Sequence, residues 1–205
     1  MDRPLVVLAS GIALLAPASC GNDETPPAEM AALMESLNLD PPVELDVDCP
    51  AIPAGAQRVL FSGVFTNQPP IRPPDPNFPA DYCPENTQFY ARADGHGNST
   101  VFGEFTWWER YCTLPGFQLS ADGYFEATNG DRLTWDALIR ADSVPPPIPY
   151  ATFVGEFTFT GGTGPFAAIQ GRANVAAKQL GDAPVGLPAG STAAAICGWI
   201  DTPAG

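Results

Sequence analysis

The feature that most constrains the fold is a series of short segments rich in Val, Phe, Tyr, Trp and Thr, which follows Pro50 and is punctuated by turn residues. Such segments are typical of β-strands. We expect eight strands, at 57–66, 87–93, 99–110, 117–128, 132–140, 150–160, 171–180 and 191–200. Eight strands in succession predict an all-β domain over residues 51–205, either an up-and-down barrel or a sandwich.

Alternation of side chains predicts which residues face the interior of that domain. In the fourth segment one parity holds Phe117, Leu119, Ala121, Phe125 and Ala127, and the other holds Gln118, Ser120, Asp122 and Glu126. In the sixth segment Phe153, Phe157 and Phe159 oppose Glu156 and Thr158. The many inward phenylalanines favour a barrel whose interior is filled by side chains.

The third segment has apolar side chains on both faces. Val101, Phe105 and Trp107 share one parity, whereas Phe102 and Trp108 have the other. This pattern predicts either a covering loop or an exposed binding patch. We favour the loop, because residues 67–86 carry seven prolines and a long ordered loop must pack against the domain.

Three glycine-containing stretches predict turns. Asn129-Gly130-Asp131 and Asp94-Gly95-His96-Gly97 are each expected to form a hairpin connection, because they supply residues that accept positive φ angles. Gly161-Gly162-Thr163-Gly164-Pro165 predicts a tight turn that leads into one helical turn at 166–169. A phosphate site is not expected there, because no G-K-[ST] follows and Pro165 has no N–H to donate.

The N-terminus has the pattern of a secretory signal peptide over residues 1–19. Arg3 precedes an apolar run at 5–15, which is shorter than a membrane-spanning helix requires. Ala18-Ser19-Cys20 resembles the end of a bacterial lipobox, in which Cys20 becomes the lipid attachment site, although Pro17 departs from that motif. The alternative is an A-x-A cleavage site that releases a soluble secreted protein starting at Ser19.

The number of cysteines supports lipid attachment. The chain has five, so a lipidated Cys20 leaves an even set for disulfides in an oxidising compartment. Three pairings are possible. We expect Cys83–Cys112, which flanks a predicted hairpin, and Cys49–Cys197, which joins the ends of the domain. A zinc site is not expected, because no C-x-x-C occurs and His96 is the only histidine.

Residues 20–50 are acidic and proline-rich, and they predict a disordered tether between the membrane and the domain. Within it, Met30, Leu33, Met34 and Leu37 recur at helical spacing. This spacing predicts a short amphipathic helix that packs on the domain, with a partner-binding role as the alternative. The chain has 23 acidic and 9 basic residues, a charge of −14 that excludes nucleic acid as an expected partner.

Two motifs carry a resemblance to a known superfamily. The run from Gly161 to Gly171, GGTGPFAAIQG, is similar to the G-G-T-G-R-F-A-G-A-T-G element of small secreted bacterial proteins and of the allene oxide cyclase and dirigent barrels. The run from Ala121 to Leu133 is similar to the F-x-A-x-N-G-D-x-L hairpin of those bacterial proteins, and the similarity spans 99–177. The resemblance implies a calycin-like, eight-stranded antiparallel barrel.

In the plant members of that superfamily the barrel cavity cyclises an epoxide or steers radical coupling. Here Pro165 replaces the family's Arg and Gln170 its Thr, and no catalytic residue of the plant enzymes has a counterpart. We therefore carry over the fold and not the activity. Other catalytic candidates are weak. His96 lies in an expected exposed turn, and Glu104 and Glu109 are expected on opposite faces of their strand.

The sequence thus predicts an exported lipoprotein, held at the bacterial cell envelope in the outer membrane or periplasm. Its barrel is expected to be noncatalytic, to need no cofactor or metal, and either to bind a small apolar ligand or an envelope protein or to serve structurally. The alternative is a cyclase or isomerase that acts on a small apolar substrate inside the barrel.

Overall fold

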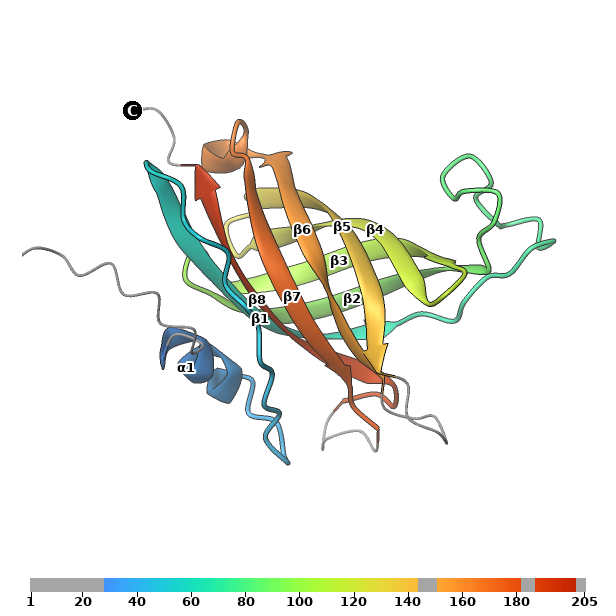
Figure 1. Ribbon diagram of the computed structural model, residues 1–205, viewed down its shortest axis with the longest axis horizontal. Coiled ribbons are helices and arrows are strands. Elements are labelled where there is room, and N and C mark those ends of the chain that lie inside the picture. The colour runs from blue at the N-terminus through green and yellow to red at the C-terminus, as the bar shows by residue number, and fades with distance from the viewer. Residues whose placement is uncertain (1–27, 144–150, 182–186, 202–205) are drawn as a thin grey trace, which may run out of the picture.

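The eight expected segments form eight strands, and these close into one antiparallel barrel (Figure 1). The computed structural model describes residues 28–143, 151–181 and 187–201. Its strands are β1 (Ala56–Asn67), β2 (Phe89–Ser99), β3 (Gly103–Leu114), β4 (Gln118–Ala127), β5 (Arg132–Ser143), β6 (Thr152–Gly162), β7 (Gly171–Gln179) and β8 (Ser191–Asp201). Each strand pairs with the next in sequence and β8 pairs with β1, so the barrel is confirmed and the sandwich is excluded. The signal peptide and Cys20 lie outside the described residues.

The strands are staggered around the barrel by ten residues. The pairing runs from Asn67 through Ala93, Glu109, Gly123, Trp135, Phe159, Gly171 and Ile200, and it reaches Gln57 rather than returning to Asn67. An eight-stranded barrel has an interior that side chains can fill or that can hold one small ligand. The residues along the inward face therefore decide which of the two applies.

One half of the interior is filled by aromatic rings. Phe61 is its centre, with the rings of Phe105, Phe125 and Phe159 between 4.7 and 5.9 Å away, measured between centroids. A Cβ atom on Gly97 would lie 2.8 Å from the Phe105 ring, so a glycine is needed for the ring to fit. This half matches the expectation of a filled barrel.

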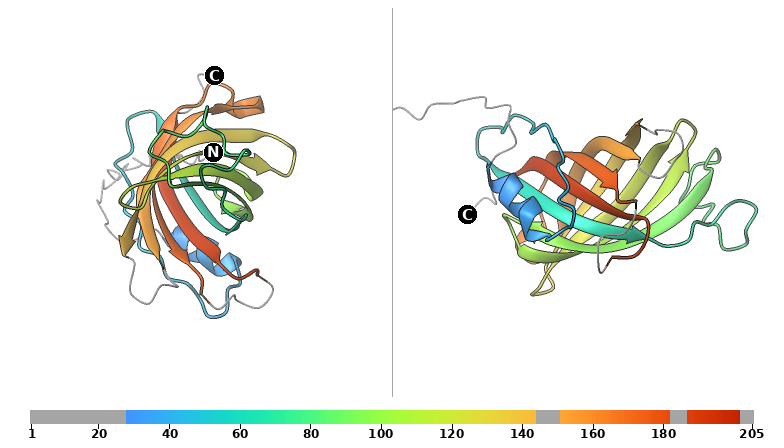
Figure 2. Two further views of the ribbon diagram at one scale, coloured as in Figure 1. Left: turned by 90° about the vertical axis from the view of Figure 1, so that its right-hand side faces the viewer. Right: turned by 90° about the horizontal axis from the view of Figure 1, so that it is seen from below.

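A helix, α1 (Ala28–Ser36), packs on the outside of β1 and β8 (Figures 1 and 2). Met30 is 1% exposed and lies in a cluster with Leu60 and Ala195. The Ser62 hydroxyl donates a hydrogen bond of 2.9 Å to the Leu33 carbonyl. The expected helix is therefore confirmed, and it packs on the domain. Residues 28–50, which the sequence placed in the disordered tether, are ordered and lie against the barrel, because their apolar side chains pack on β1 and β8 and Cys49 is bonded to Cys197.

Both expected disulfides are confirmed. Cys49–Cys197 ties the segment after α1 to the outer face of β8, and Cys83–Cys112 ties the proline-rich segment to β3. The proline-rich segment between β1 and β2, residues 68–88, extends from one end of the barrel in Figure 1 and returns to β2.

The hairpin expected at 94–97 is wrong. These residues lie within β2 and pair with both β1 and β3. Gly95 and Gly97 face the interior, where a side chain would collide with the backbone of β1, so they permit close strand packing and do not make a turn. The connection to β3 falls at 100–102, and β3 starts later and ends later than expected.

The proline-rich loop does not cover the outward apolar side chains of the third expected strand, contrary to the expectation. On the outside, Trp108 stacks on Tyr124 with ring centroids 5.4 Å apart. Phe102 folds over the end of the barrel, 4.9 Å from the Phe166 ring. The proline-rich segment covers Tyr90 and Cys112 instead of Trp108. Phe117, expected to face inward, lies in the β3–β4 turn with a φ of 58° and is 57% exposed.

The other turns follow their sequences. Gly130 has a φ of 87°, and the Asn129 side chain accepts a hydrogen bond of 3.0 Å from the Asp131 backbone N–H. Gly161, Gly162 and Gly164 all have positive φ angles, and Gly164 begins a 3-10 turn, η1 (Gly164–Phe166). The helical turn therefore comes two residues earlier than expected.

Candidate functional site

The barrel interior contains one carboxyl group, that of Glu109, among the described side chains that face inward from its strands. Glu109 follows Phe105 and Trp107 on the inward parity of β3, and it is 4% exposed. The residues directly opposite it on the neighbouring strands are Ala93 and Gly123. These two neighbours have a methyl group and no side chain respectively, and the Trp135 ring fills the space over Gly123.

Glu109 has one hydrogen bond, in which Trp107 Nε1 donates to its Oε2 at 3.0 Å. Burial raises the pKa of the Glu109 carboxyl from 4.5 to about 8, and the Trp107 hydrogen bond opposes that rise only in part. The carboxyl group is therefore protonated at neutral pH. A protonated carboxyl group is a hydrogen-bond donor as well as an acceptor.

Two further polar groups line the same inward face of β3. The Tyr111 hydroxyl donates to Asn67 Oδ1 at 3.1 Å, and its pKa is raised by burial and by the nearby Glu109 charge. Thr113 is 1% exposed, and its hydroxyl has no hydrogen-bond partner among the described residues. Polar groups therefore extend along β3 from Glu109 toward the end of the strand.

Trp135 adds a hydrogen-bond donor without a partner. Its side chain is 1% exposed, and its Nε1 has no partner among the described residues. The ring lies against Gly123, the residue opposite Glu109, because a Cβ atom on Gly123 would be 2.6 Å from it. Buried polar groups nearly always have a hydrogen-bond partner, so the Trp135 indole N–H calls for an acceptor other than the described residues.

The end of the barrel beyond Glu109 is accessible to solvent. Four apolar side chains that face inward there are only partly buried, namely Phe89, Leu119, Ile139 and Phe153. By contrast, Phe61 and Phe125 in the aromatic half are 0% exposed. Solvent thus reaches the outermost inward-facing side chains at this end, as it also reaches Val101 and Phe102 at the opposite end, whereas Glu109 lies deeper. The β5–β6 and β7–β8 connections, at 144–150 and 182–186, lie outside the described residues.

The arrangement combines apolar walls with a few polar groups, which is the composition of small-molecule sites. A neutral Glu109 and the Trp135 N–H, which has no partner among the described residues, are both hydrogen-bond donors, so they favour a ligand with a hydrogen-bond acceptor. An anionic ligand is disfavoured, because moving its charge from water into this apolar interior costs free energy.

The residues considered from sequence take different positions. Glu104 is exposed on the outside of β3, so it does not join Glu109, as strand parity predicted. His96 is exposed on β2, in a strand rather than the expected turn. The described residues contain no group of three His, Cys, Asp or Glu side chains that could hold a metal ion. Within the same residues no helix has the length and hydropathy of a membrane span.

Sequence reasoning did not single out Glu109 as a site residue. Its inward orientation was nevertheless predictable, because it shares the parity of Phe105 and Trp107. The orphaned Trp135 N–H had no such sequence indication. No protein-family model, curated protein or solved structure matches the chain.

Proposed function

We propose that this barrel is a binding domain for a small, mostly apolar ligand that bears a hydrogen-bond acceptor. One observation carries the proposal: a buried carboxyl group that is neutral at neutral pH, and an indole N–H with no hydrogen-bond partner among the described residues, lie at the same register of the barrel interior. The ligand would enter past Leu119 and Phe153 and accept hydrogen bonds from Glu109 and Trp135.

We further propose that the domain is exported and held at the bacterial cell envelope by lipid on Cys20. Two lines of support are the signal-peptide pattern of residues 1–19 and the pairing of the other four cysteines in disulfides, which leaves Cys20 as the single unpaired cysteine. Disulfides are typical of oxidising compartments outside the cytoplasm.

Binding is tested with the neutral fluorescent ketone Prodan, whose emission shifts to the blue in an apolar site. The wild-type protein is expected to bind it at micromolar concentration. Ala121→Phe places a ring on the inward face of β4, opposite Tyr111 and two residues from the partner of Glu109, and it is expected to weaken binding at least tenfold. Ser120→Phe makes the same change on the outward face of that strand and serves as the control.

Circular dichroism establishes that both variants are folded before they are compared. Equal binding by the wild type and Ala121→Phe would contradict an interior site. Equal binding of dimethylaminonaphthalene, which lacks the ketone, would contradict the role of hydrogen-bond donors in the site.

A second function, as a cyclase or isomerase, is favoured by one specific observation. A carboxyl group that stays protonated at neutral pH can transfer its proton to an epoxide or carbonyl oxygen of a bound substrate, and then recover a proton from the product. Incubation with apolar epoxides, followed by mass spectrometry and chromatography, tests this. Turnover by the wild type that Glu109→Gln abolishes while Prodan binding persists would support the enzyme.

A further inference from the structure

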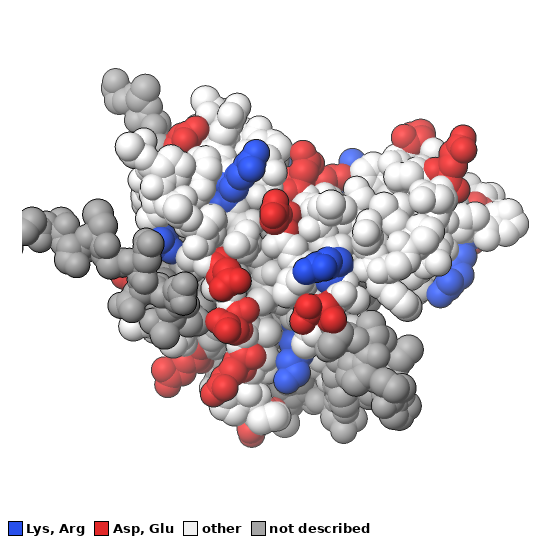
Figure 3. Space-filling model, in the orientation of Figure 1, with Lys and Arg blue, Asp and Glu red and all other residues white. Residues whose placement is uncertain are grey.

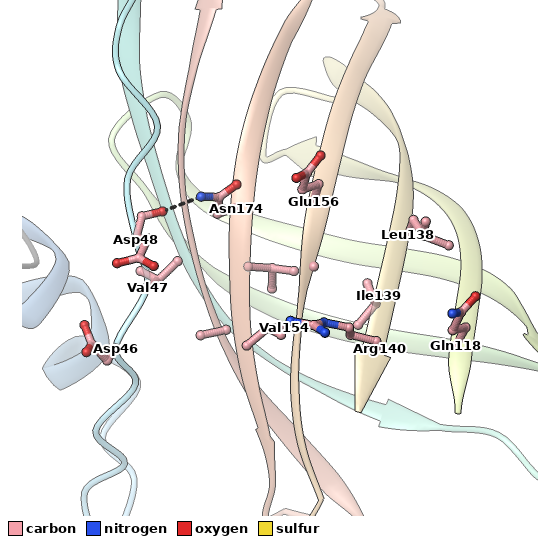
Figure 4. Close-up of a pocket in the computed structure, with 13 residues that line it drawn as sticks. Asp46, Val47, Asp48, Gln118, Leu138, Ile139, Arg140, Val154, Glu156 and Asn174 are labelled. Atoms are coloured by element: carbon pink, nitrogen blue, oxygen red, sulfur yellow. Dashed lines mark hydrogen bonds between the residues drawn. The ribbon is translucent and has the colours of Figure 1, made fainter. Parts of the chain in front are cut away.

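The outer face of the barrel has a groove that is separate from the interior site. Two adjoining hollows, of about 430 and 390 Å³, lie over β4 to β7. Leu138 and Glu156 line both hollows, so the two form one continuous groove. Figure 4 shows Leu138 and Glu156 on adjacent strands, and the segment that carries Asp46 and Asp48 beside Asn174 on the next strand.

The floor of the groove is apolar. Leu138 is 60% exposed, which is the largest exposed fraction among the large apolar side chains described. Val154 and Ala176 continue the apolar surface on β6 and β7. An exposed leucine in the middle of a groove favours contact with an apolar group of a partner.

One wall of the groove is held in place by the fold. Val47 is 4% exposed, and the Asp48 carbonyl accepts a hydrogen bond of 2.8 Å from Asn174 Nδ2 (Figure 4). The next residue, Cys49, is bonded to Cys197. The carboxylates of Asp46 and Asp48 are therefore attached to a fixed segment.

The rim of the groove is acidic. Asp46, Asp48, Asp136 and Glu156 are exposed, and Arg140 is the only basic residue that lines either hollow. The two ion pairs among the described residues, Arg110–Asp122 and Arg132–Glu126, involve none of these four carboxylates. On the face shown in Figure 3, acidic side chains gather along the segment after α1 and over the neighbouring strands.

We propose that this groove docks a cationic peptide segment in an extended conformation, with an apolar side chain over Leu138 and basic side chains at the acidic rim. Three strand spacings separate β4 from β7, or about 14 Å, which roughly five extended residues can span. The closed barrel has no free strand edge, so the contact is made by side chains over the sheet face. A second copy of this chain, an anionic lipid surface and nucleic acid are all repelled by the acidic rim.

The test uses a fluorescein-labelled peptide of sequence Lys-Leu-Lys-Leu-Lys and fluorescence anisotropy on the full chain with both disulfides formed. We expect saturable binding that weakens with added salt, and no binding of Glu-Leu-Glu-Leu-Glu. The double variant Asp48→Asn with Glu156→Gln, and separately Leu138→Gln, are each expected to weaken binding at least fivefold.

Two matched controls distinguish binding in the groove from nonspecific attraction to acidic or apolar surface. Glu104→Gln removes an exposed carboxylate on β3, and Ile52→Gln removes an apolar side chain that is 40% exposed, both outside the groove. Equal loss in the controls and the groove variants would overturn the proposal, as would equally tight competition by spermidine, which carries charge but no apolar side chain. Prodan binding by the same variants is expected to be unchanged, because that probe reports on the interior.

Discussion

Replacing Glu109 by Gln is expected to change how the stability of the barrel depends on pH. Burial raises the pKa of this carboxyl group from 4.5 to about 8 in the folded protein. Gln has nearly the same shape, can still accept the hydrogen bond from Trp107 Nε1, and cannot ionise. The comparison of the two proteins therefore isolates one proton.

The direction of the pH dependence follows from the linkage between proton binding and unfolding. Below pH 4.5 both folded and unfolded chains hold the Glu109 proton. Between pH 4.5 and about 8 the unfolded chain has lost it and the folded chain keeps it, so the wild type loses stability as pH rises. Above about pH 8 both states are ionised and the dependence levels off.

The magnitude follows from the same two pKa values. Each pH unit in that window changes the free energy of unfolding by about 1.4 kcal/mol. Over the whole window the stability of the wild type relative to Glu109→Gln is expected to fall by an amount on the order of 5 kcal/mol, with the variant the more stable protein at high pH.

The assay is urea unfolding followed by tryptophan fluorescence at several pH values from 4 to 9, a range of about five pH units that brackets the linkage window. Glu104→Gln is the control, because its carboxylate is exposed and its removal is expected to leave the pH dependence unchanged. Parallel curves for the wild type and Glu109→Gln would refute the reasoning, because they would show that Glu109 ionises alike in the folded and unfolded chains.

Three further predictions concern the fold and the anchor. Replacing both cysteines of a disulfide by Ser is expected to lower the free energy of unfolding by about 3–4 kcal/mol for Cys83–Cys112 and by about 5 kcal/mol for Cys49–Cys197. The second loss is larger because the bond closes a chain segment of 148 residues rather than 29. Urea unfolding of the two variants checks this order, and the reverse order would contradict it. Gly123→Ala is expected to destabilise the barrel by about 1–3 kcal/mol, because the new methyl group meets the Trp108 backbone carbonyl oxygen and the Trp135 ring; unchanged stability would contradict this close packing. Expression in a bacterium is expected to add a diacylglycerol-sized mass that Cys20→Ser removes; a soluble chain starting at Ser19 in both cases would exclude the anchor.

The strand order and closure were largely predictable because local chemistry and the global fold agree over most of the chain. Alternating residues in 117–128 and 150–160 identified the inward face of β4 and β6, with Phe117 as the exception. The disulfide pairing followed from which cysteines bracket a hairpin and which lie at the ends of the domain.

The errors have a common cause in tertiary packing. Gly95 and Gly97 have turn chemistry, yet they serve close contact with β1 and make room for the Phe105 ring, which no local pattern reveals. The position of the proline-rich segment over Tyr90 depends on its disulfide to β3. The interior site was predictable only in part. Parity places Glu109 inside, but the position of Trp135 next to it depends on the register of β3, β4 and β5, and so does the lack of a partner for the Trp135 N–H among the described residues.

The most direct test of the account is an NMR titration of the four indole N–H groups with Prodan. Trp107 and Trp135 face the interior, whereas Trp108 and Trp199 face outward and serve as internal controls. We predict a downfield shift of the Trp135 indole proton as it gains an acceptor, a smaller change at Trp107, and no change at the other two. An unchanged Trp135 resonance at saturating Prodan, or changes confined to Trp108 and Trp199, would contradict a ligand site inside the barrel.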